Sequence, residues 1–224
     1  GALIMQYKHQ YVDGTAVDLP VGKVVCVGRN YADHAAELNN PVPVTPMLFI
    51  KPSTAIVPLA DPFSVPVDFG SVHFETEMAI LIGQTLKNAT HPEVEAAVAG
   101  VGVALDLTLR DLQSKLKDQG HPWEKSKGFD GACPLSAFLE PVAVGDLQDQ
   151  QIRLTVNGEL RQNGNSSHML NKVVPLIAYM SHYFTLLPGD VVLTGTPAGV
   201  GAINPGDNLL VELGEQLRIE TQAI

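Results

Sequence analysis

The sequence predicts an α+β fold in which short strands dominate and helices are few. Apolar runs are brief and are separated by turns, consistent with the 20 glycines and 16 prolines among 224 residues. Helical patterns occur at only a few places along the chain. Strands and helices do not alternate regularly, which argues against a doubly wound parallel sheet. The sequence contains no internal repeats and no low-complexity tracts, so a repeat architecture is not expected.

The first elements are expected at the N-terminus and around residue 30. Asp13-Gly14 is a hairpin turn signal, so residues 1–20 are expected to form a strand pair ahead of a catalytic domain over 21–224. The apolar run 24–27 is expected to be a buried strand. Residues 31–38, rich in Ala and Glu, favour a short helix that ends before Pro41.

The central elements follow from apolar runs and their alternation. Residues 47–50 predict a buried strand, and the proline-rich stretch 60–70 predicts a loop or a sheet edge. Residues 73–82 alternate as a single strand should. Residues 92–98 open with Pro and acidic residues, as helices do, and 100–107 predict a strand that contains glycines.

The last part of the chain is expected to hold more strands than helices. A helix is expected over 110–117, an irregular segment over 120–134, and a second long helix over 174–184. Asn157-Gly158 predicts a tight hairpin turn. The remaining strands are expected at 153–156, 159–162, 190–194, 209–213 and 218–220, with a glycine-rich loop over 195–201.

Composition narrows the function classes. The chain carries 14 Lys and Arg against 24 Asp and Glu, a formal charge of −10, which disfavours nucleic-acid binding. No apolar stretch reaches 18 residues, so no membrane span is expected. The N-terminus lacks a charged region followed by a long apolar core, so no signal peptide is expected. Cys26 and Cys133 lie in apolar or small-residue surroundings, and a cytoplasmic location without disulfides is therefore expected.

Three carboxylates are the strongest candidate for a metal site. Glu75 and Glu77 are two residues apart on a predicted strand, so both side chains point to the same face. That face turns apolar at once, and buried carboxylates need a cation between them. Asp106 ends an apolar run and supplies a third oxygen ligand, as Mg²⁺ prefers. The alternatives are a solvent-facing strand, and Asp106 as a helix N-cap.

A histidine–carboxylate pair is the candidate proton-transfer group. His34 and Glu37 are three residues apart on a predicted helix and share a face, an arrangement that raises imidazole basicity and fixes its tautomer. The alternative is an ordinary surface pair. Arg110 follows Asp106 by four residues and can grip a carboxylate.

The other candidates lie in loops and at strand ends. Gln113 follows Arg110 by three residues. Lys51 and Lys127 have small or apolar neighbours, although the lysines at 125 and 127 can also be read as solvated. The loop at 195–201 lacks the ending of a phosphate-binding loop, and we expect Thr196 to face a substrate anion there.

Taken together, ordered segments of the chain resemble the fumarylacetoacetate hydrolase family, in its single-domain acylpyruvase, fumarylpyruvate hydrolase and oxaloacetate decarboxylase–tautomerase branch. The matching segments run from about residue 20 to the end and are Gly28–His34, Leu48–Pro52, His73–Glu77, Ala104–Gln113, Pro122-Trp123 with Lys127, and Thr194–Gly201.

The resemblance implies a mixed β-sandwich or β-roll fold, a homodimer, and a metal held by Glu75, Glu77 and Asp106. It implies a His34–Glu37 dyad on a lid and Lys127 beside the metal. It also places the substrate carboxylate on Arg110, Gln113 and Thr196; Lys51 is a further substrate-binding candidate. One departure is Phe74, where the branch often has a second histidine.

These observations predict an enzyme that acts on a small keto acid with Mg²⁺, or with Mn²⁺ or Ca²⁺. The main expectation is hydrolysis of a C–C bond in an acylpyruvate through a metal-stabilised pyruvate enolate, with water activated by His34. Keto–enol tautomerisation or decarboxylation of oxaloacetate passes through a related enolate and is the alternative. A non-catalytic module that binds a metal or keto acid is a remote third possibility.

Overall fold

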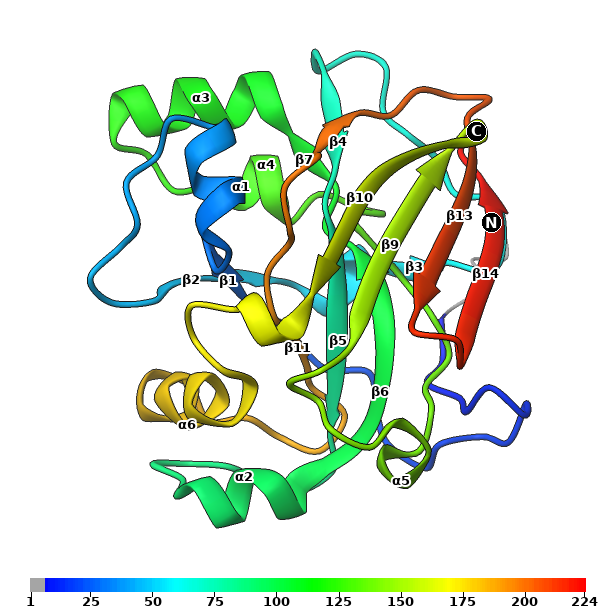
Figure 1. Ribbon diagram of the computed structural model, residues 1–224. Coiled ribbons are helices and arrows are strands. Elements are labelled where there is room, and N and C mark those ends of the chain that lie inside the picture. The colour runs from blue at the N-terminus through cyan, green and yellow to red at the C-terminus, as the bar shows by residue number, and fades with distance from the viewer. Residues whose placement is uncertain (1–6) are drawn as a thin grey trace, which may run out of the picture.

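A computed structural model describes residues 7–224 and places most of the strands in one curled, mixed sheet (Figure 1). This sheet has seven strands. It is mixed because β1 pairs in parallel with β11 and β3 in parallel with β8, whereas its other neighbouring strands pair antiparallel. In spatial order its strands are β2 (Met47–Lys51), β1 (Val24–Gly28), β11 (Val191–Leu193), β5 (Thr76–Ile82), β6 (Val98–Leu105), β8 (Cys133–Leu135) and β3 (Ile56–Pro58).

Two smaller sheets complete the strand framework, and the larger of them packs in front of the central sheet in Figure 1. The four-stranded sheet consists of β10 (Glu159–Asn165), β9 (Gln151–Val156), β13 (Asn208–Leu213) and β14 (Leu217–Gln222). The three-stranded sheet consists of β12 (Gly201–Ala202), β4 (Val72–Phe74) and β7 (Thr108–Leu109). The predicted strand-dominated α+β class is confirmed.

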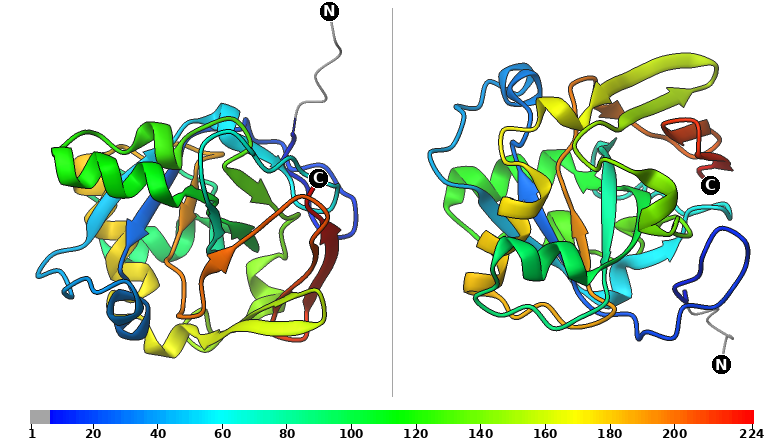
Figure 2. Two further views of the ribbon diagram at one scale, coloured as in Figure 1. Left: turned by 90° about the horizontal axis from the view of Figure 1, so that it is seen from above. Right: turned by 60° about the horizontal axis from the view of Figure 1, so that its bottom comes forward.

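Helices are short and lie around the sheets, as the two further views show (Figure 2). Local signals explain their ends: Thr90 and Glu93 form a capping box at one helix start, and Gly120 ends another with φ +68°. The α-helices are α1 (Ala32–Glu37), α2 (His91–Ala97), α3 (Arg110–Gln119), α4 (Glu124–Lys127), α5 (Pro141–Val144) and α6 (Val173–Tyr183); 3₁₀ turns occur at Ser53–Ala55 and Ser166–His168. Across residues 7–224, none of the helices combines the length and apolarity that crossing a bilayer requires.

The central sheet is covered on both faces. Alternate residues of β1 belong to two different apolar clusters: Val25 and Val27 to one, Val24 and Cys26 to the other. This alternation is the two-residue period of a strand. The larger cluster fills the space toward the four-stranded sheet and α6, whereas the smaller one lies toward β8 and the N-terminal segment. Burial on both faces makes the central strands a rigid support for side chains at their ends.

The predicted single strand over 73–82 is wrong in one informative respect. The chain leaves the three-stranded sheet after Phe74 and enters the central sheet at Thr76, so Glu75 lies at a corner between them. A matching corner follows β6, and the two corners are joined because the Asp106 N–H donates to the Glu75 carbonyl over 2.7 Å. Two of the candidate metal ligands therefore face each other where the sheets meet.

Other predictions differ from the structure in detail. The segment 120–134, expected to be irregular, contains α4 and the start of β8. The Asn157-Gly158 hairpin turn is confirmed, with φ values of +50° and +81°. Of the N-terminal strand pair, residues 1–6 lie outside the described part. The rest forms the expected turn but a single bridge, between Gln10 and Ala16.

Candidate metal centre and substrate cleft

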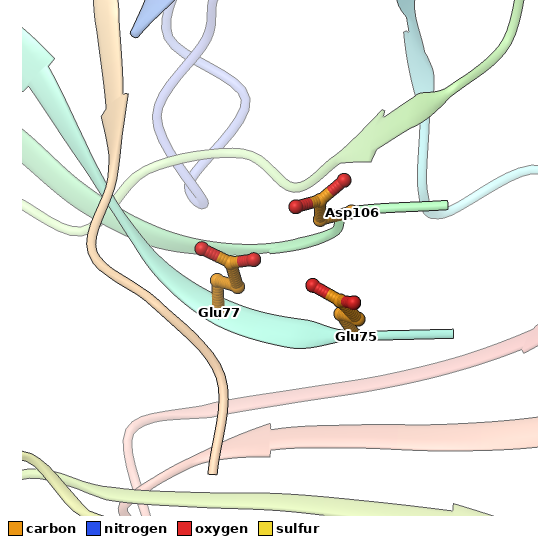
Figure 3. Close-up of side chains that lie close together, drawn as sticks. All are labelled: Glu75, Glu77 and Asp106. Atoms are coloured by element: carbon orange, nitrogen blue, oxygen red, sulfur yellow. The ribbon is translucent and has the colours of Figure 1, made fainter. Parts of the chain in front are cut away.

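Glu75, Glu77 and Asp106 converge on one point (Figure 3). Each offers an oxygen atom that lies within 4.8 Å of those of the other two. Their exposed fractions are 5%, 1% and 0%, so all three are buried. The corner between β4 and β5 presents Glu75, β5 presents Glu77, and the end of β6 presents Asp106. The structure thus brings together the three residues that the sequence singled out.

Cations neutralise only part of this cluster. Arg110 donates to Glu75 over 2.6 Å, and Lys127 Nζ lies 3.4 Å from Glu75 and 3.1 Å from Asp106. Against the cost of burial, Lys127 and then Arg110 hold the pKa of Glu75 well below its usual range. The Glu77 carboxylate instead accepts a backbone N–H from Gly195 over 2.7 Å.

The residues present fit a hard divalent cation. Burial raises the pKa of Glu77 well above its ordinary value, and the carboxylates of Asp106 and Glu75 raise it further. Asp106 Oδ1 is buried and accepts no hydrogen bond from residues 7–224, although Lys51 Nζ lies 2.7 Å away. Three converging, buried oxygen donors, of which Glu77 has no cationic partner within residues 7–224, are the ligand set that Mg²⁺ or Mn²⁺ prefers.

Lys51 has a different place from the one expected. It is completely buried, and its ammonium group donates to the carbonyls of Lys127 and Ala132 over 2.6 and 3.0 Å and to that of Leu107 over 3.2 Å. It also forms an ion pair with Asp106 over 2.7 Å. Because Lys51 is enclosed and is not among the residues that line the cleft, the geometry favours a role in positioning Asp106 and the backbone of Lys127 over direct contact with a substrate.

A cleft opens beside the three carboxylates. It encloses about 400 Å³ of space, part of it open to solvent. Six of the candidate site residues line it, together with residues from β1, β2 and α3. The lining residues are Val27, Gly28, Arg29, His34, Leu38, Asn40, Met47, Phe49, Glu75, Arg110, Gln113, Lys117, Trp123, Lys127 and Thr196. Glu75 therefore connects the carboxylate cluster to a cavity of small-molecule size.

The predicted dyad is formed on α1. His34 Nδ1 lies 2.8 Å from Glu37 Oε1, and the other oxygen of Glu37 accepts the Gly199 N–H over 2.9 Å. Glu37 therefore connects the short helix to the glycine-rich loop on the other side of the cleft. Among the described residues His34 Nε2 has no hydrogen-bond partner, and His34 lines the cleft. This geometry suits a ring whose second nitrogen exchanges a proton with a bound molecule.

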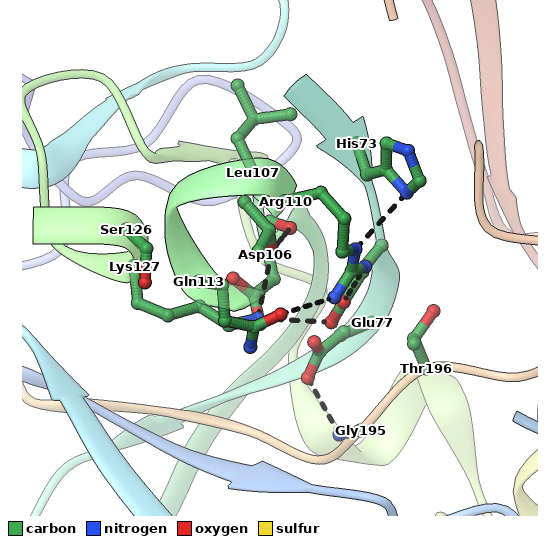
Figure 4. Close-up of polar contacts among 12 residues, drawn as sticks. His73, Glu77, Asp106, Leu107, Arg110, Gln113, Ser126, Lys127, Gly195 and Thr196 are labelled. Atoms are coloured by element: carbon green, nitrogen blue, oxygen red, sulfur yellow. Dashed lines mark hydrogen bonds and ion pairs between the residues drawn. The ribbon is translucent and has the colours of Figure 1, made fainter. Parts of the chain in front are cut away.

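Arg110 is largely committed to the protein (Figure 4). Besides Glu75, its guanidinium donates to Gln113 over 2.8 Å and to His73 Nδ1 over 3.2 Å. Gln113 and Thr196 both line the cleft and are nearly buried, at 4% and 2% exposure. Arg110 thus orients Gln113 and Glu75 at the cleft wall, which leaves fewer of its N–H groups for a substrate carboxylate than the sequence suggested.

Lys127 projects into the cleft beside two of the carboxylates. Its ammonium also donates to Thr108 Oγ1 over 2.9 Å and lies 4.8 Å from the ring centre of Phe49. Although burial opposes it, Asp106 and then Glu75 raise the pKa of Lys127. Lys127 is therefore cationic at neutral pH and able to stabilise negative charge that develops beside the carboxylates.

Sequence reasoning missed Gln162, which joins two parts of the site. Its Oε1 accepts the N–H of Thr76, the residue between the two glutamates, over 3.0 Å. Its Nε2 donates to Thr196 Oγ1 over 2.7 Å and to the Pro197 carbonyl over 2.9 Å. Because both backbone partners have a fixed polarity, the amide orientation is fixed too. The Thr196 oxygen therefore accepts from Gln162, and its own proton is free for an anion in the cleft.

Replacing Gln162 by methionine is expected to weaken both folding and substrate binding. The variant leaves the Thr76 N–H and the Pro197 carbonyl buried without a partner, which costs about 1–3 kcal/mol. The melting temperature should fall by about 2–4 °C for each kcal/mol, and KM should rise because Thr196 is no longer oriented. Thermal unfolding and steady-state kinetics measure both. Gln222→Met, at an exposed position, is the control; equal melting temperatures for the two variants would contradict the prediction.

Comparisons with known proteins find one family and several relatives over most of the chain. The family described as fumarylacetoacetate (FAA) hydrolase, C-terminal, matches residues 23–224. The oxaloacetate tautomerase YcgM of Escherichia coli (strain K12) is 57% identical over 207 residues, which cover 92% of this chain and 94% of the relative.

Two solved structures show how far the fold is shared. A fumarylacetoacetate hydrolase family protein from Yersinia pestis CO92 superposes with a TM-score of 0.96 at 51% identity, covering 97% of this chain and all of the other. The fumarylpyruvate hydrolase of Pseudomonas aeruginosa, solved with Mn²⁺ and pyruvate, gives 0.91 at 33% identity and covers 100% of this chain and 98% of that one.

Proposed function

The chain belongs to the fumarylacetoacetate hydrolase family, and on that premise we propose that it interconverts the keto and enol forms of oxaloacetate. The observation that carries this proposal is the similarity to the Escherichia coli oxaloacetate tautomerase, which extends over nearly the whole of both chains. It favours the tautomerase alternative over the acylpyruvate hydrolysis that was the main expectation. The chain is accordingly an enzyme of this family, and the comparisons support an isomerisation ahead of a hydrolysis.

The residues of the cleft suit a reaction that consists of proton transfers. A divalent cation held by Glu75, Glu77 and Asp106 would act as a Lewis acid and stabilise negative charge on the substrate oxygens. His34, with its tautomer fixed by Glu37, exchanges a proton with C3 of the substrate. Lys127 exchanges the matching proton with the 2-oxygen, and Thr196 donates a hydrogen bond to a substrate carboxylate. Tautomerisation adds no atom and therefore requires no attacking water.

Hydrolysis of an acylpyruvate remains the second candidate. The solved fumarylpyruvate hydrolase with Mn²⁺ and pyruvate supports it, at lower identity than the tautomerase. The His34–Glu37 pair also supports it, because a buried imidazole beside a carboxylate can activate water. Decarboxylation of oxaloacetate needs no activated water, so it would use the same cation site without that role of His34.

A substrate panel separates these reactions. With Mg²⁺, the protein is expected to accelerate loss of the enol form of oxaloacetate, followed by ultraviolet absorbance, without forming pyruvate. Acetylpyruvate and fumarylpyruvate should persist, and a chelator should abolish the reaction. Chelator-sensitive cleavage of an acylpyruvate, with pyruvate as the product, would instead establish the hydrolase. Pyruvate formed from oxaloacetate would establish the decarboxylase.

His34→Ala assigns the dyad in whichever reaction is found. We expect it to slow tautomerisation by about 10²–10⁴-fold, the usual contribution of a positioned acid or base. Asp33→Ala, one residue earlier on the exposed side of α1, is the matched control. Unchanged tautomerisation in His34→Ala would remove the dyad from the mechanism.

The remaining features of the proposal are the cation, the assembly and the compartment. We propose Mg²⁺ as the physiological ion, with Mn²⁺ as a functional substitute. A homodimer is supported by exposed apolar side chains such as Val67 and Phe69, at 71% and 59% exposure, which a second copy could cover. A cytoplasmic location is supported by two buried cysteines that form no disulfide.

A further inference from the structure

Two cations of the cleft have no role in the reaction described above. Arg29 precedes α1, and Lys117 lies in the last turn of α3; both line the same cleft as His34 and Lys127. Neither forms an ion pair or a side-chain hydrogen bond with any residue of the described range 7–224. An unpaired cation in the wall of a cleft is available to a ligand.

The backbone places Arg29 in the cleft under strain. Its φ is +57°, a left-handed conformation that is unfavourable for a non-glycine residue. The next residue, Asn30, is fully buried and cannot relax, because its amide donates to the Thr194 carbonyl over 2.8 Å and accepts the Asn171 N–H over 2.7 Å. Strain of this kind persists where surrounding structure imposes it, and it gathers at functional sites.

Lys117 is held beside other cations. Its ammonium lies 5.2 Å from the ring centre of Trp123. Burial first, and then the charges of Arg29, Arg110 and Lys127, lower the pKa of Lys117 to about 8. A second hollow beside the cleft is also lined by Lys117, and its acidic residue is Asp118. Asp118 is exposed and forms no ion pair with Lys117 among residues 7–224. Positive charge is therefore concentrated at this end of the cleft in a chain whose net charge is −10.

The other cations of the site are already engaged. Arg110 binds Glu75, Gln113 and His73, and Lys127 binds Glu75 and Asp106. In the proposed function, one substrate carboxylate binds near Thr196, beside the carboxylate cluster. A monocarboxylic keto acid would leave Arg29 and Lys117 without a counterion, whereas a second carboxylate at the other end of a short chain would neutralise them.

We propose that Arg29 and Lys117 form a subsite for the second carboxylate of a four-carbon dicarboxylic acid. This inference rests on the proposed function, which it deepens, since it makes the substrate's distal carboxylate a requirement. The two residues then select dianions such as oxaloacetate against keto acids that end in a methyl group. Selectivity arises from charge placed in a partly desolvated cleft, where an unpaired carboxylate or cation is costly.

Matched unreactive ligands test the subsite without depending on turnover. L-Malate and L-2-hydroxybutanoate differ only in a terminal carboxylate against a methyl group, and calorimetry with Mg²⁺ measures both dissociation constants. Lys117→Met and Arg29→Asn, the latter tolerant of a left-handed backbone, are each expected to weaken malate binding about tenfold, the loss of one charge-assisted hydrogen bond. Binding of 2-hydroxybutanoate should change less than about twofold.

Lys115→Met is the control, because it removes the same charge from the exposed side of the same helix. It is expected to leave both ligands unaffected. Equal weakening of both ligands in Lys117→Met and Arg29→Asn, or no weakening of malate, would overturn the subsite. Absence of oxaloacetate turnover in the wild-type protein would overturn the proposed function alone, because the malate preference is measured independently of it.

Discussion

Replacing Glu77 by glutamine is expected to stabilise the metal-free protein and to destroy its response to Mg²⁺. Burial, Asp106 and Glu75 all raise the pKa of Glu77, which means that the folded protein disfavours the ionised carboxylate. At neutral pH the carboxylate of the unfolded chain is ionised, so moving it into this site costs stability when no cation is bound. Glutamine keeps the shape and can still accept the Gly195 N–H, but it carries no charge.

The metal-loaded protein should respond in the opposite direction. A cation that binds only the folded state stabilises it more as the free ion concentration rises above its Kd. Wild-type protein should therefore melt at a higher temperature with Mg²⁺ than with chelator. In Glu77→Gln this increase should nearly vanish. Turnover should fall by about 10³-fold or more, because Lewis-acid stabilisation lowers the reaction barrier by several kcal/mol.

Thermal unfolding with chelator and with Mg²⁺ measures both signs in one experiment. Without the ion, the variant should melt a few degrees above wild type, at about 2–4 °C for each kcal/mol gained. Glu95→Gln removes an equal charge from an exposed position on α2 and should change neither measurement. A Glu77→Gln protein that melts lower with chelator and keeps its Mg²⁺ response would refute the assignment of Glu77 as a metal ligand.

The sequence could predict the carboxylate cluster because its signal is local. Two glutamates at strand spacing, on a face that becomes apolar by Ala79, already imply buried charge that needs a cation. The corner at Glu75 could not be predicted from the sequence, because the strand breaks where its pairing partners change. Those partners, β7, β12, β6 and β11, are distant in the sequence.

The residues that support the site were harder to predict for the same reason. Gln162 lies in a hairpin strand with mostly exposed neighbours, and nothing near it in the sequence marks the buried amide that reaches Thr76 and Thr196. Lys51 was recognised as a residue of interest, but its complete enclosure was not. Its pattern, a lysine after an apolar strand, is the same whether the ammonium faces a cleft or the protein interior.

Replacing Lys51 by methionine is expected to be the most destabilising single change considered for this protein. The side chain is fully enclosed, and its ammonium serves three backbone carbonyls and the Asp106 carboxylate. Removing one partner of a buried ion pair costs about 3–5 kcal/mol; here Asp106 would keep only Lys127, 3.1 Å away, and the three carbonyls would lose their donor. The melting temperature with chelator should fall by roughly 6–20 °C, since each kcal/mol corresponds to about 2–4 °C. Lys125→Met, on the exposed face of α4, provides the matched control and should melt near wild type.

A double variant separates the ion pair from simple loss of packing. Asp106→Asn alone leaves Lys51 buried without its counterion, and Lys51→Met alone leaves Asp106 with Lys127 as its remaining cation. The combined variant contains neither isolated charge, so its loss of stability should be smaller than the sum of the two single losses by about 0.5–3 kcal/mol. Chelator must be present throughout, because Asp106 is also a proposed metal ligand. Additive losses would mean that Lys51 supports the site through its carbonyl contacts, which fix the backbone of Lys127, rather than through the charge of Asp106.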